Sequence, residues 1–240
     1  MTIEHVIIAE HRTSIGLSFK HDLSSAEKLD QLLATRATDL PVVRLQDIVE
    51  RLAKARNVLV LMPGPGLARL SNIVRILSDC ARGLVIVDSA VDYLHRHSDI
   101  LQYLKDTVDF SILVTDLDSS PTAFRDVSRV LDPVIVVHAH GGNEDRLDIV
   151  LELENTVCGT CQVDVPYLRY VSYCPGFTDG DRALYMTHLA GCRALVLGWN
   201  PDVEQCLASK PITRIKKLKL SMAKEILQEL RWLGGFFLFF

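Results

Sequence analysis

The stretch Phe110-Ser-Ile-Leu-Val-Thr-Asp116-Leu-Asp118-Ser-Ser-Pro121 joins an apolar, β-branched run to two carboxylates and a turn that contains proline. Continuous runs of this kind are typical of parallel strands that are buried on both faces. Ligands of open α/β sheets collect just beyond the carboxyl ends of such strands. Because residues two apart on a strand point to the same side, we expect Asp116 and Asp118 to converge. The stretch therefore predicts a parallel sheet with an acidic site at its edge.

Two converging carboxylates need compensation for their mutual repulsion. At a separation of about 4 Å and an effective dielectric of about 20, the repulsion amounts to roughly 4 kcal/mol. Keeping both groups ionised near neutral pH favours a bound cation, and hard oxygen ligands suit Mg²⁺. The alternative is an ordinary turn in which one aspartate caps the next helix.

The rest of the chain repeats this order of strand, polar cluster and helix. Strand-type runs lie at 57–62, 83–87, 133–137, 167–173 and 193–199, and helices are expected at 67–77, 90–104, 121–131 and 144–154. The alternation predicts an α/β fold, a mostly parallel open sheet with helices on both faces. In a doubly wound sheet, the polar clusters that follow strands would converge at one edge. These clusters are at 63–66, 88–90, 115–119, 138–143 and 176–182.

We divide the chain into three regions. Residues 1–56 are predicted to form an N-terminal helical region, with one helix that starts at the capping-box-like Ser24-Ser-Ala-Glu27 and another from Leu45. Residues 57–210 are predicted to form the α/β catalytic domain. Residues 211–240 are predicted to hold a helix and a Phe-rich tail that pack on this domain.

Two of the polar clusters have both a structural and a functional interpretation. Pro63-Gly-Pro-Gly66 lies between a strand and a helix, where glycines allow a phosphate to approach and a helix N-terminus favours an anion. A tight turn between a strand and a helix needs glycine in any case. Asp88 ends its strand as Asp116 does, and is either a metal ligand or a helix N-cap.

The cluster His138-Ala-His-Gly-Gly-Asn143 holds two imidazoles two residues apart. Such a pair is typical of H-x-H sites for transition metals. Alternatively, the pair and the two glycines form the floor of a polar pocket, in which the ring nitrogens bind phosphate oxygens. Asn143 is then an amide ligand or the cap of the helix that follows.

The cluster Gly176-Phe-Thr-Asp-Gly-Asp-Arg182 contains a capping box of the type T-x-x-D. The box accounts for Thr178 and Asp181 but not for Asp179. Arg182 is suited to hold a phosphate in a bidentate fork. A basic run at 214–219 opens the last helix, which is expected over about 214–233. We favour a solvated face for this run, with phosphate contact as the alternative.

Composition excludes several classes of function. The net charge of −4 over 240 residues leaves no electrostatic footprint for nucleic acid. No apolar run approaches the roughly 20 residues of a membrane span, and the N-terminus lacks the features of a signal peptide, so we expect a cytoplasmic protein without membrane contact. Cys158-Gly-Thr-Cys161 has no second ligand pair, which favours ordinary thiols over zinc or redox chemistry. The tail at 235–240 either packs on the body or permits a homodimer.

These motifs, taken in order, resemble one family. They are Asp88-Ser-Ala, Thr115-Asp-Leu-Asp118, His138-Ala-His-Gly-Gly-Asn143, Gln162 and Gly176-Phe-Thr-Asp-Gly-Asp-Arg182. The pattern is similar to the archaeal 6-hydroxymethyl-7,8-dihydropterin diphosphokinases of the type called MptE-like, and to the catalytic domain of thiamine pyrophosphokinases. The resemblance covers about 57–200. The chain departs from it at Gly142, where aspartate is usual, and at Ser89, where glycine is common.

The resemblance implies transfer of diphosphate from ATP to the hydroxymethyl group of the pterin, with release of AMP, in the biosynthesis of folate-type or methanopterin cofactors. It implies that Asp116 and Asp118, with Asp88 and Asp179, hold Mg²⁺. His138, His140, Asn143 and Arg182 are then the catalytic residues, and either histidine is a candidate general base. The residues implied to contact the substrates are Pro63, Gly64, Pro65, Gly66, Ser89, Gly141, Gly176, Phe177 and Thr178.

Two alternatives remain open at this point. One is a metal-dependent hydrolase that uses His138 and His140. The other is a nucleotide-binding protein without catalysis, to which Gly142 gives some support.

Overall fold

A computed structural model describes residues 18–199 and 213–240, and all structural statements concern these residues. Nine strands form one sheet within them. The strands are β1 (Val42–Val43), β2 (Asn57–Leu61), β3 (Gly83–Val87), β4 (Phe110–Thr115), β5 (Val134–Ala139), β6 (Val157–Cys161), β7 (Val171–Tyr173), β8 (Arg193–Leu197) and β9 (Phe236–Phe239). The helices are α2 (Phe19–Arg36), α3 (Leu45–Lys54), α4 (Leu70–Cys80), α5 (Ala90–Arg96), α6 (Ser98–Thr107), α7 (Pro121–Leu131), α8 (Asp179–Leu189) and α9 (Arg214–Trp232), with 3-10 helices η1 (Pro65–Arg69) and η2 (Glu144–Leu151).

The strand order is β1-β6-β5-β4-β3-β2-β8-β9, and every pairing is parallel. β1 and β7 pair with successive parts of the same edge of β6. From β2 the chain steps through β3, β4 and β5 to β6, and it later returns to place β8 on the other side of β2. This reversal makes a topological switch point, where ligands of open α/β sheets bind. The predicted α/β fold with a mostly parallel open sheet is confirmed.

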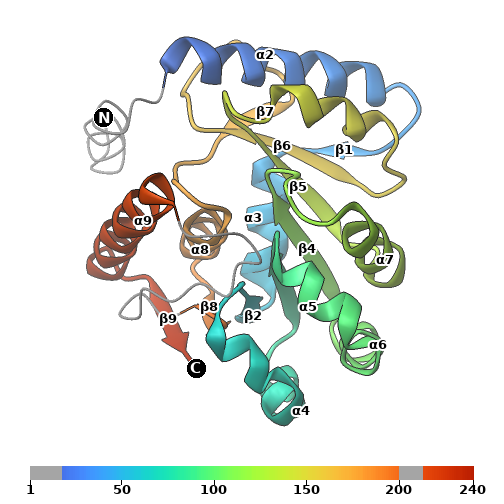
Figure 1. Ribbon diagram of the computed structural model, residues 1–240, viewed down its shortest axis with the longest axis vertical. Helices are drawn as coiled ribbons and strands as arrows, with labels where there is room; N and C mark the ends of the chain where they lie inside the picture. Colours follow the sequence, from blue (N-terminus) through green and yellow to red (C-terminus); the bar gives the residue numbers. More distant parts are fainter. Residues whose placement is uncertain (1–17, 200–212) are drawn as a thin grey trace.

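Helices cover both faces of the sheet (Figure 1). α2, α4, α5, α6 and α7 pack on one face, and α3, α8 and α9 pack on the other. A hydrophobic core lies on each face of the sheet, and β4 contributes side chains to both. Leu113 packs in the core under α2, α4, α5, α6 and α7, whereas Ile112 and Val114 pack in the core under α3, α8 and α9. Burial on both faces accounts for the uninterrupted apolar run in this strand.

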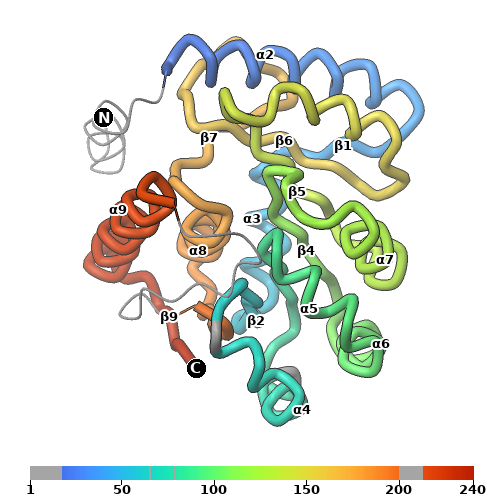
Figure 2. Tube along the Cα trace, in the orientation of Figure 1, coloured from blue at the N-terminus to red at the C-terminus, as the bar shows by residue number. Residues whose placement is uncertain are grey.

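The first part of the chain joins the same sheet. β1 pairs with β6, and α2 packs along η2, which is more than a hundred residues away in the sequence (Figure 2). Lys28 of α2 forms an ion pair with Asp148 of η2 at 2.6 Å. At the other end of the chain, β9 pairs with β8. The division at residues 56 and 210 stays a prediction.

The structure corrects four predicted elements. The helix at 90–104 is two helices, α5 and α6, because the backbone leaves the helical region at His97. The strand at 167–173 is reduced to Val171–Tyr173, since the Asp30 carboxylate takes up the N–H groups of Tyr170 and Val171.

The other two corrections concern helix ends. The helix at 144–154 is the 3-10 helix η2 and stops at Leu151, because the buried Arg36 guanidinium donates to the carbonyl oxygens of Val150 and Leu153. The first helix begins at Phe19, with Ser18 as its N-cap, rather than at Ser24.

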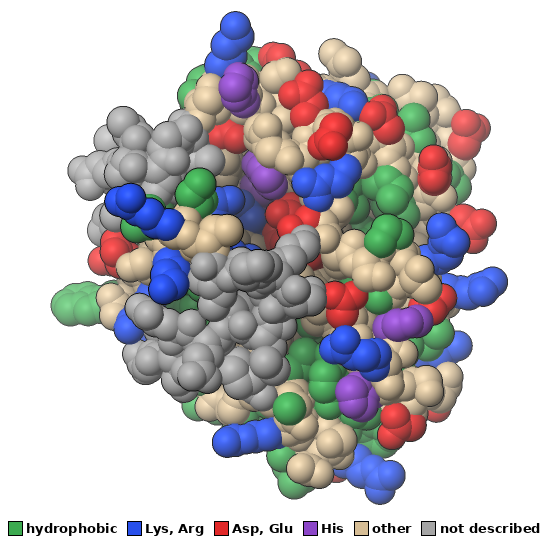
Figure 3. Space-filling model, viewed as in Figure 1, with side chains coloured by type: hydrophobic (Ala, Val, Ile, Leu, Met, Phe, Trp, Pro, Cys, Tyr) green, Lys and Arg blue, Asp and Glu red, His purple; other side chains and the backbone are tan. Residues whose placement is uncertain are grey.

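The surface of the described residues is mixed in charge. On the face shown in Figure 3, basic and acidic side chains are interspersed. None of the helices in this part of the chain has an apolar stretch long enough to cross a membrane.

Candidate active site

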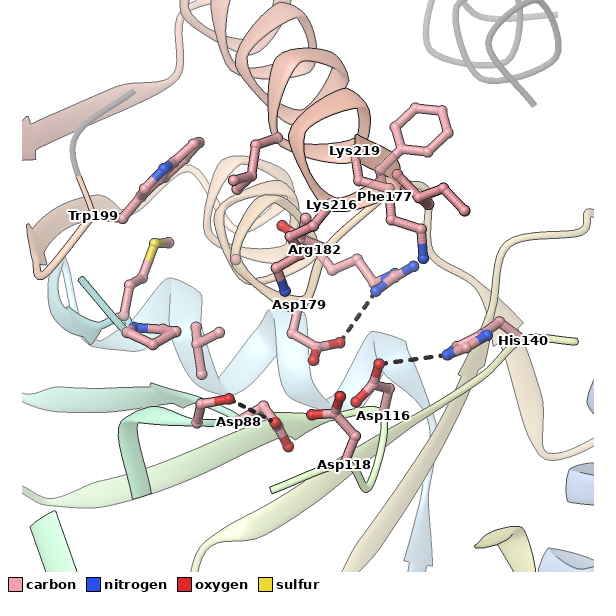
Figure 4. Close-up of a pocket in the computed structure, with 18 of the residues that line it drawn as sticks. Asp88, Asp116, Asp118, His140, Phe177, Asp179, Arg182, Trp199, Lys216 and Lys219 are labelled. Atoms are coloured by element: carbon pink, nitrogen blue, oxygen red, sulfur yellow. Dashed lines mark hydrogen bonds and ion pairs between the residues drawn. The ribbon is translucent and has the colours of Figure 1, made fainter. Parts of the chain in front are cut away.

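A pocket of about 310 Å³ lies at the carboxyl ends of the central strands, between the sheet and the N-terminal ends of α8 and α9 (Figure 4). It collects side chains that follow β2, β3, β4, β5 and β8. The predicted site residues that line it are Pro63, Asp88, Ser89, Asp116, Asp118, His140, Phe177, Thr178, Asp179 and Arg182. The predicted convergence of clusters from separate strands at one sheet edge is therefore observed.

Three carboxylates form the floor of the pocket. Asp88, Asp116 and Asp179 each offer an oxygen atom, and these atoms all lie within 4.8 Å of one another. The Oδ1 atom of Asp116 is buried and has no hydrogen-bond partner among the described residues. Asp118 lines the pocket beside them. An all-oxygen set with an unpaired buried oxygen fits a hard divalent cation such as Mg²⁺.

Asp116 and Asp118 converge for a different reason from the one predicted. β4 ends at Thr115, so the two aspartates lie in a turn and not on the strand. Leu117 between them has a φ of 65°, in the left-handed region. A leucine in this region is unusual. The turn, rather than strand alternation, directs both carboxylates into the pocket.

The carboxylates differ in acidity. Burial, followed by the charges of Asp179 and Asp116, raises the pKa of Asp88 well above its usual range. Burial and the charge of Asp116 raise the pKa of Asp179 to about 8, although Arg182 opposes the shift. Burial acts in the same direction on Asp116, but His140, Arg182 and Lys219 outweigh it and lower the pKa to about 2. Without a cation, Asp116 is therefore the ionised member of the cluster near neutral pH, while burial favours the neutral forms of Asp88 and Asp179.

The raised pKa of Asp179 predicts a pH-dependent stability. A carboxyl group whose pKa rises on folding stabilises the fold below its unfolded pKa, near 4, and loses that contribution as the pH rises through the folded pKa. For Asp179 the loss extends from about pH 4 to about pH 8. In a buffer that contains a chelator, the thermal unfolding midpoint of the wild-type protein should therefore fall more steeply over this pH range than that of Asp179→Asn. Asparagine is chosen because its side-chain oxygen can still accept a hydrogen bond from Arg182. If the unfolding midpoint depended equally on pH in the two proteins, the raised pKa of Asp179 would be contradicted.

The N-terminus of α8 presents Asp179 to the cluster. Thr178 is the N-cap, and it and Asp181 form the predicted capping box, with the Thr178 N–H donating to Asp181 at 2.7 Å. Arg182 forms an ion pair with Asp179 at 3.1 Å and donates to the carbonyl oxygen of Gly176 at 3.1 Å. The capping box thus frees Asp179 for the pocket, as the sequence suggested.

The two histidines have different environments. His140 lines the pocket, and its Nε2 lies 3.4 Å from a carboxylate oxygen of Asp116. His138 lies inside β5 and is fully buried, with its Nδ1 3.1 Å from the Thr160 hydroxyl. Burial lowers the pKa of His138 well below its usual value. Only His140 of the pair lines the pocket, and the two ring centroids lie 6.4 Å apart, so the geometry favours the carboxylates over the histidine pair as the metal site.

Five other predicted site residues do not line the pocket: Gly64, Gly66, Gly141, Asn143 and Gly176. The side chain of Pro65 lies outside the described part of the structure. At Gly64 an added Cβ would lie 2.1 Å from the carbonyl oxygen of Gly198, so this glycine allows two turns to meet. The N–H of Gly141 donates to the buried carboxylate of Asp22 at 2.7 Å. Asn143 is fully buried, and its side-chain amide forms hydrogen bonds with the backbone of Asp116, His138 and His140.

Several lining residues were not predicted as site residues. Lys216 and Lys219 of α9 face the carboxylates, which supports the phosphate-contact alternative for the basic run (Figure 4). Their spacing of three residues puts them on one helix face, a signal present in the sequence. Arg146 bridges the loops by donating to the carbonyl oxygens of Leu117 and Gly142 at 3.3 Å. Trp199 lies on the side of the pocket opposite His140 (Figure 4), and Met62 adds a further apolar lining residue.

Comparisons with known proteins bear on this site. The chain is 28% identical to the 6-hydroxymethyl-7,8-dihydropterin pyrophosphokinase of Methanocaldococcus jannaschii over 220 residues, which cover 85% of each protein. The protein of the same name from Methanothermobacter thermautotrophicus is 28% identical over 88% of this chain and 87% of the relative. The one from Pyrococcus furiosus is 38% identical over 50% of this chain and 53% of the relative. No protein-family model matches the chain. These three archaeal homologues confirm the resemblance inferred from the motifs.

Proposed function

We propose that this chain, a homologue of the archaeal 6-hydroxymethyl-7,8-dihydropterin pyrophosphokinases, transfers a diphosphate group from ATP to the hydroxymethyl group of 6-hydroxymethyl-7,8-dihydropterin and releases AMP. The observation that carries the proposal is the cluster of Asp88, Asp116 and Asp179 that faces two lysines across one pocket. Such a pairing of acidic and basic groups suits a polyphosphate with its divalent cation.

Phosphate binding is supported from the α-helical side of the pocket. Lys216 and Lys219 of α9 and Arg182 of α8 point toward the carboxylates (Figure 4). Thr178 and Thr213, the N-caps of α8 and α9, also line the pocket. Helix N-termini carry partial positive charge and unpaired N–H groups, so two of them beside three basic side chains favour a bound triphosphate.

Asp88, Asp116 and Asp179, with Asp118 beside them, are the residues proposed to hold Mg²⁺. Bound there, Mg²⁺ would neutralise negative charge on the triphosphate as the transferred group leaves. The carboxylates of Asp88 and Asp179 would give up their protons on binding, since their pKa values are raised without a cation.

The reaction forms one bond and breaks one. The hydroxymethyl oxygen of the pterin attacks the β-phosphorus of ATP in line, and the bond from that phosphorus to the oxygen that bridges to the α-phosphorus breaks. AMP leaves with the bridging oxygen, and the hydroxyl proton passes to a base. His140 is the candidate base, because it lines the pocket and Asp116 orients its ring. Positioning and charge neutralisation carry most of the catalysis in such transfers.

The choice of His140 predicts a moderate loss on substitution. His140→Gln should lower kcat by about 10²-fold, the lower end of the usual range for a general base, because loose phosphoryl-transfer transition states need little activation of the nucleophile. Steady-state kinetics at saturating ATP would measure it. The matched control is His95→Gln, an exposed histidine that pairs with Asp126 on the surface. An unchanged kcat in His140→Gln would rule out His140 as the base.

The function is tested with purified protein, ATP, Mg²⁺ and 6-hydroxymethyl-7,8-dihydropterin, with thiamine as a parallel acceptor. We expect AMP to form only when the pterin is present, and only when Mg²⁺ is added. If AMP formed with thiamine but not with the pterin, the proposed reaction type would stand and the acceptor would be thiamine. ATP binding without AMP from either acceptor would favour the non-catalytic alternative. The proposed product would enter folate-type or methanopterin cofactor biosynthesis.

A further inference from the structure

The hydroxyl group of Thr115 lies between the two loops that carry the acidic cluster. Thr115 is the last residue of β4, is fully buried and does not line the pocket. Its Oγ1 lies 2.5 Å from Oδ1 of Asp88, which follows β3. The same oxygen accepts the N–H of Leu117 at 2.8 Å. One hydroxyl therefore contacts the carboxylate of one loop and the backbone of the other.

The direction of both bonds follows from the groups involved. An ionised carboxylate can only accept hydrogen bonds, and a backbone N–H can only donate. When Asp88 is ionised, as a cation ligand must be, the Thr115 hydroxyl uses its single proton on Asp88 and a lone pair on Leu117. A side chain without a hydroxyl can make neither bond.

The bond to Leu117 holds an unfavourable turn. Leu117 is in the left-handed region, which a leucine occupies only when its surroundings impose it. Thr115 holds the N–H of Leu117 from one side. From the other side, the Asn143 amide donates to the carbonyl oxygen of Asp116 at 2.9 Å and to that of His138 at 2.8 Å. Both polar groups of the peptide unit that joins Asp116 to Leu117 are thus held, the N–H by Thr115 and the carbonyl oxygen by Asn143.

We propose that Thr115 is a positioning residue for the metal ligands: its hydroxyl sets Asp88 and the Asp116 turn at the spacing that a divalent cation requires. The inference rests on the metal site of the proposed function. Groups that orient metal ligands from behind typically change metal affinity or activity by about 10- to 100-fold when they are removed. Asn143 holds the Asp116 turn in the same way from the loop that follows β5.

The test compares a substitution that removes the hydroxyl with one that keeps it. Thr115→Val removes the hydroxyl and keeps the shape, whereas Thr115→Ser keeps the hydroxyl. The readout is the affinity for Mn²⁺ alone, without nucleotide, from electron paramagnetic resonance of free Mn²⁺. We expect Thr115→Val to bind Mn²⁺ about 10- to 100-fold more weakly than wild type, and Thr115→Ser to stay within about threefold of it.

The matched control lies on the same strand. Ser111 is buried near the other end of β4, and its hydroxyl donates to the carbonyl oxygen of Leu131 at 3.0 Å. Ser111→Ala removes a buried hydroxyl of β4 away from the cluster, so it should change thermal stability and leave Mn²⁺ affinity unchanged. Each variant is confirmed as folded by its unfolding transition, and Thr115→Ala replaces Thr115→Val if the latter does not fold.

The outcomes separate this inference from the proposed function. Wild-type affinity in Thr115→Val, equally weak binding in Thr115→Ser, or no Mn²⁺ binding by wild type would each overturn the inference. If wild type and Thr115→Ser bind Mn²⁺ well, Thr115→Val binds it weakly and no protein forms AMP with the pterin, the proposed function fails while the role of Thr115 stands.

Discussion

Asp116→Asn should reduce diphosphate transfer by at least about 10³-fold, the scale on which charge stabilisation acts in phosphoryl transfer. Asp116 is the cluster member that is ionised without a cation, since its pKa is lowered to about 2, and its Oδ1 has no hydrogen-bond partner within the described structure. Asparagine keeps the shape but removes the charge on which cation binding depends. The measurement is the initial rate of AMP formation at saturating ATP and pterin, titrated with Mg²⁺.

The fold of Asp116→Asn should survive, because two effects on stability oppose each other. The lowered pKa of Asp116 means that its charge stabilises the fold above about pH 4, and asparagine loses that contribution. The same charge raises the pKa of Asp88 and Asp179, and asparagine relieves this repulsion. The matched control is Asp109→Asn, an exposed aspartate just before the same strand that pairs with Arg82. Undiminished turnover in Asp116→Asn would remove Asp116 from the metal site.

Replacing Lys216 and Lys219 together with glutamine should lower kcat/KM for ATP by about 10²- to 10³-fold, the cost of removing a preorganised donor to a developing charge. Both lysines line the pocket, and burial lowers the pKa of Lys219, with the charge of Arg182 acting in the same direction. A cation held close to other cations is stabilised by a bound polyanion. Steady-state kinetics at several salt concentrations would measure the loss and a reduced dependence of kcat/KM on salt.

Lys217→Gln is the matched control for the lysine pair. Lys217 belongs to the same basic run and the same turn of α9, but it does not line the pocket. It should keep kcat/KM close to that of wild type. Equal losses in Lys217→Gln and the double variant would mean that α9 acts through its general charge, and the assignment of two specific phosphate contacts would be wrong.

The sequence was sufficient to predict the sheet and the edge at which the site lies. The run at 110–115 is apolar throughout because both faces of β4 are buried, and that pattern is local. Asp116 was predicted as a metal ligand because it follows a strand, whereas the metal roles of Asp88 and Asp179 were what the resemblance implied. Their proximity follows from parallel topology, which brings the carboxyl ends of strands to one edge.

Details that depend on strand ends and distant contacts were not predictable. β5 continues through His138 to Ala139, two residues beyond the predicted end, so His138 is directed into the interior and only His140 reaches the pocket. Gly64 meets Gly198, far along the chain, and no local pattern distinguishes this packing from a phosphate loop. The lysines of α9 reach the site because α9 packs on α8, a long-range contact that helical spacing does not reveal.

The transfer of an intact diphosphate is tested most directly by the fate of the β-phosphorus. ATP labelled with ³²P at the β-position is incubated with the protein, Mg²⁺ and 6-hydroxymethyl-7,8-dihydropterin, and the products are separated. The proposed reaction moves the label to the pterin and leaves AMP unlabelled, and Asp116→Asn should abolish this movement. Label recovered in ADP would indicate transfer of a single phosphoryl group, and label in free pyrophosphate would indicate hydrolysis; either result would contradict the proposed function.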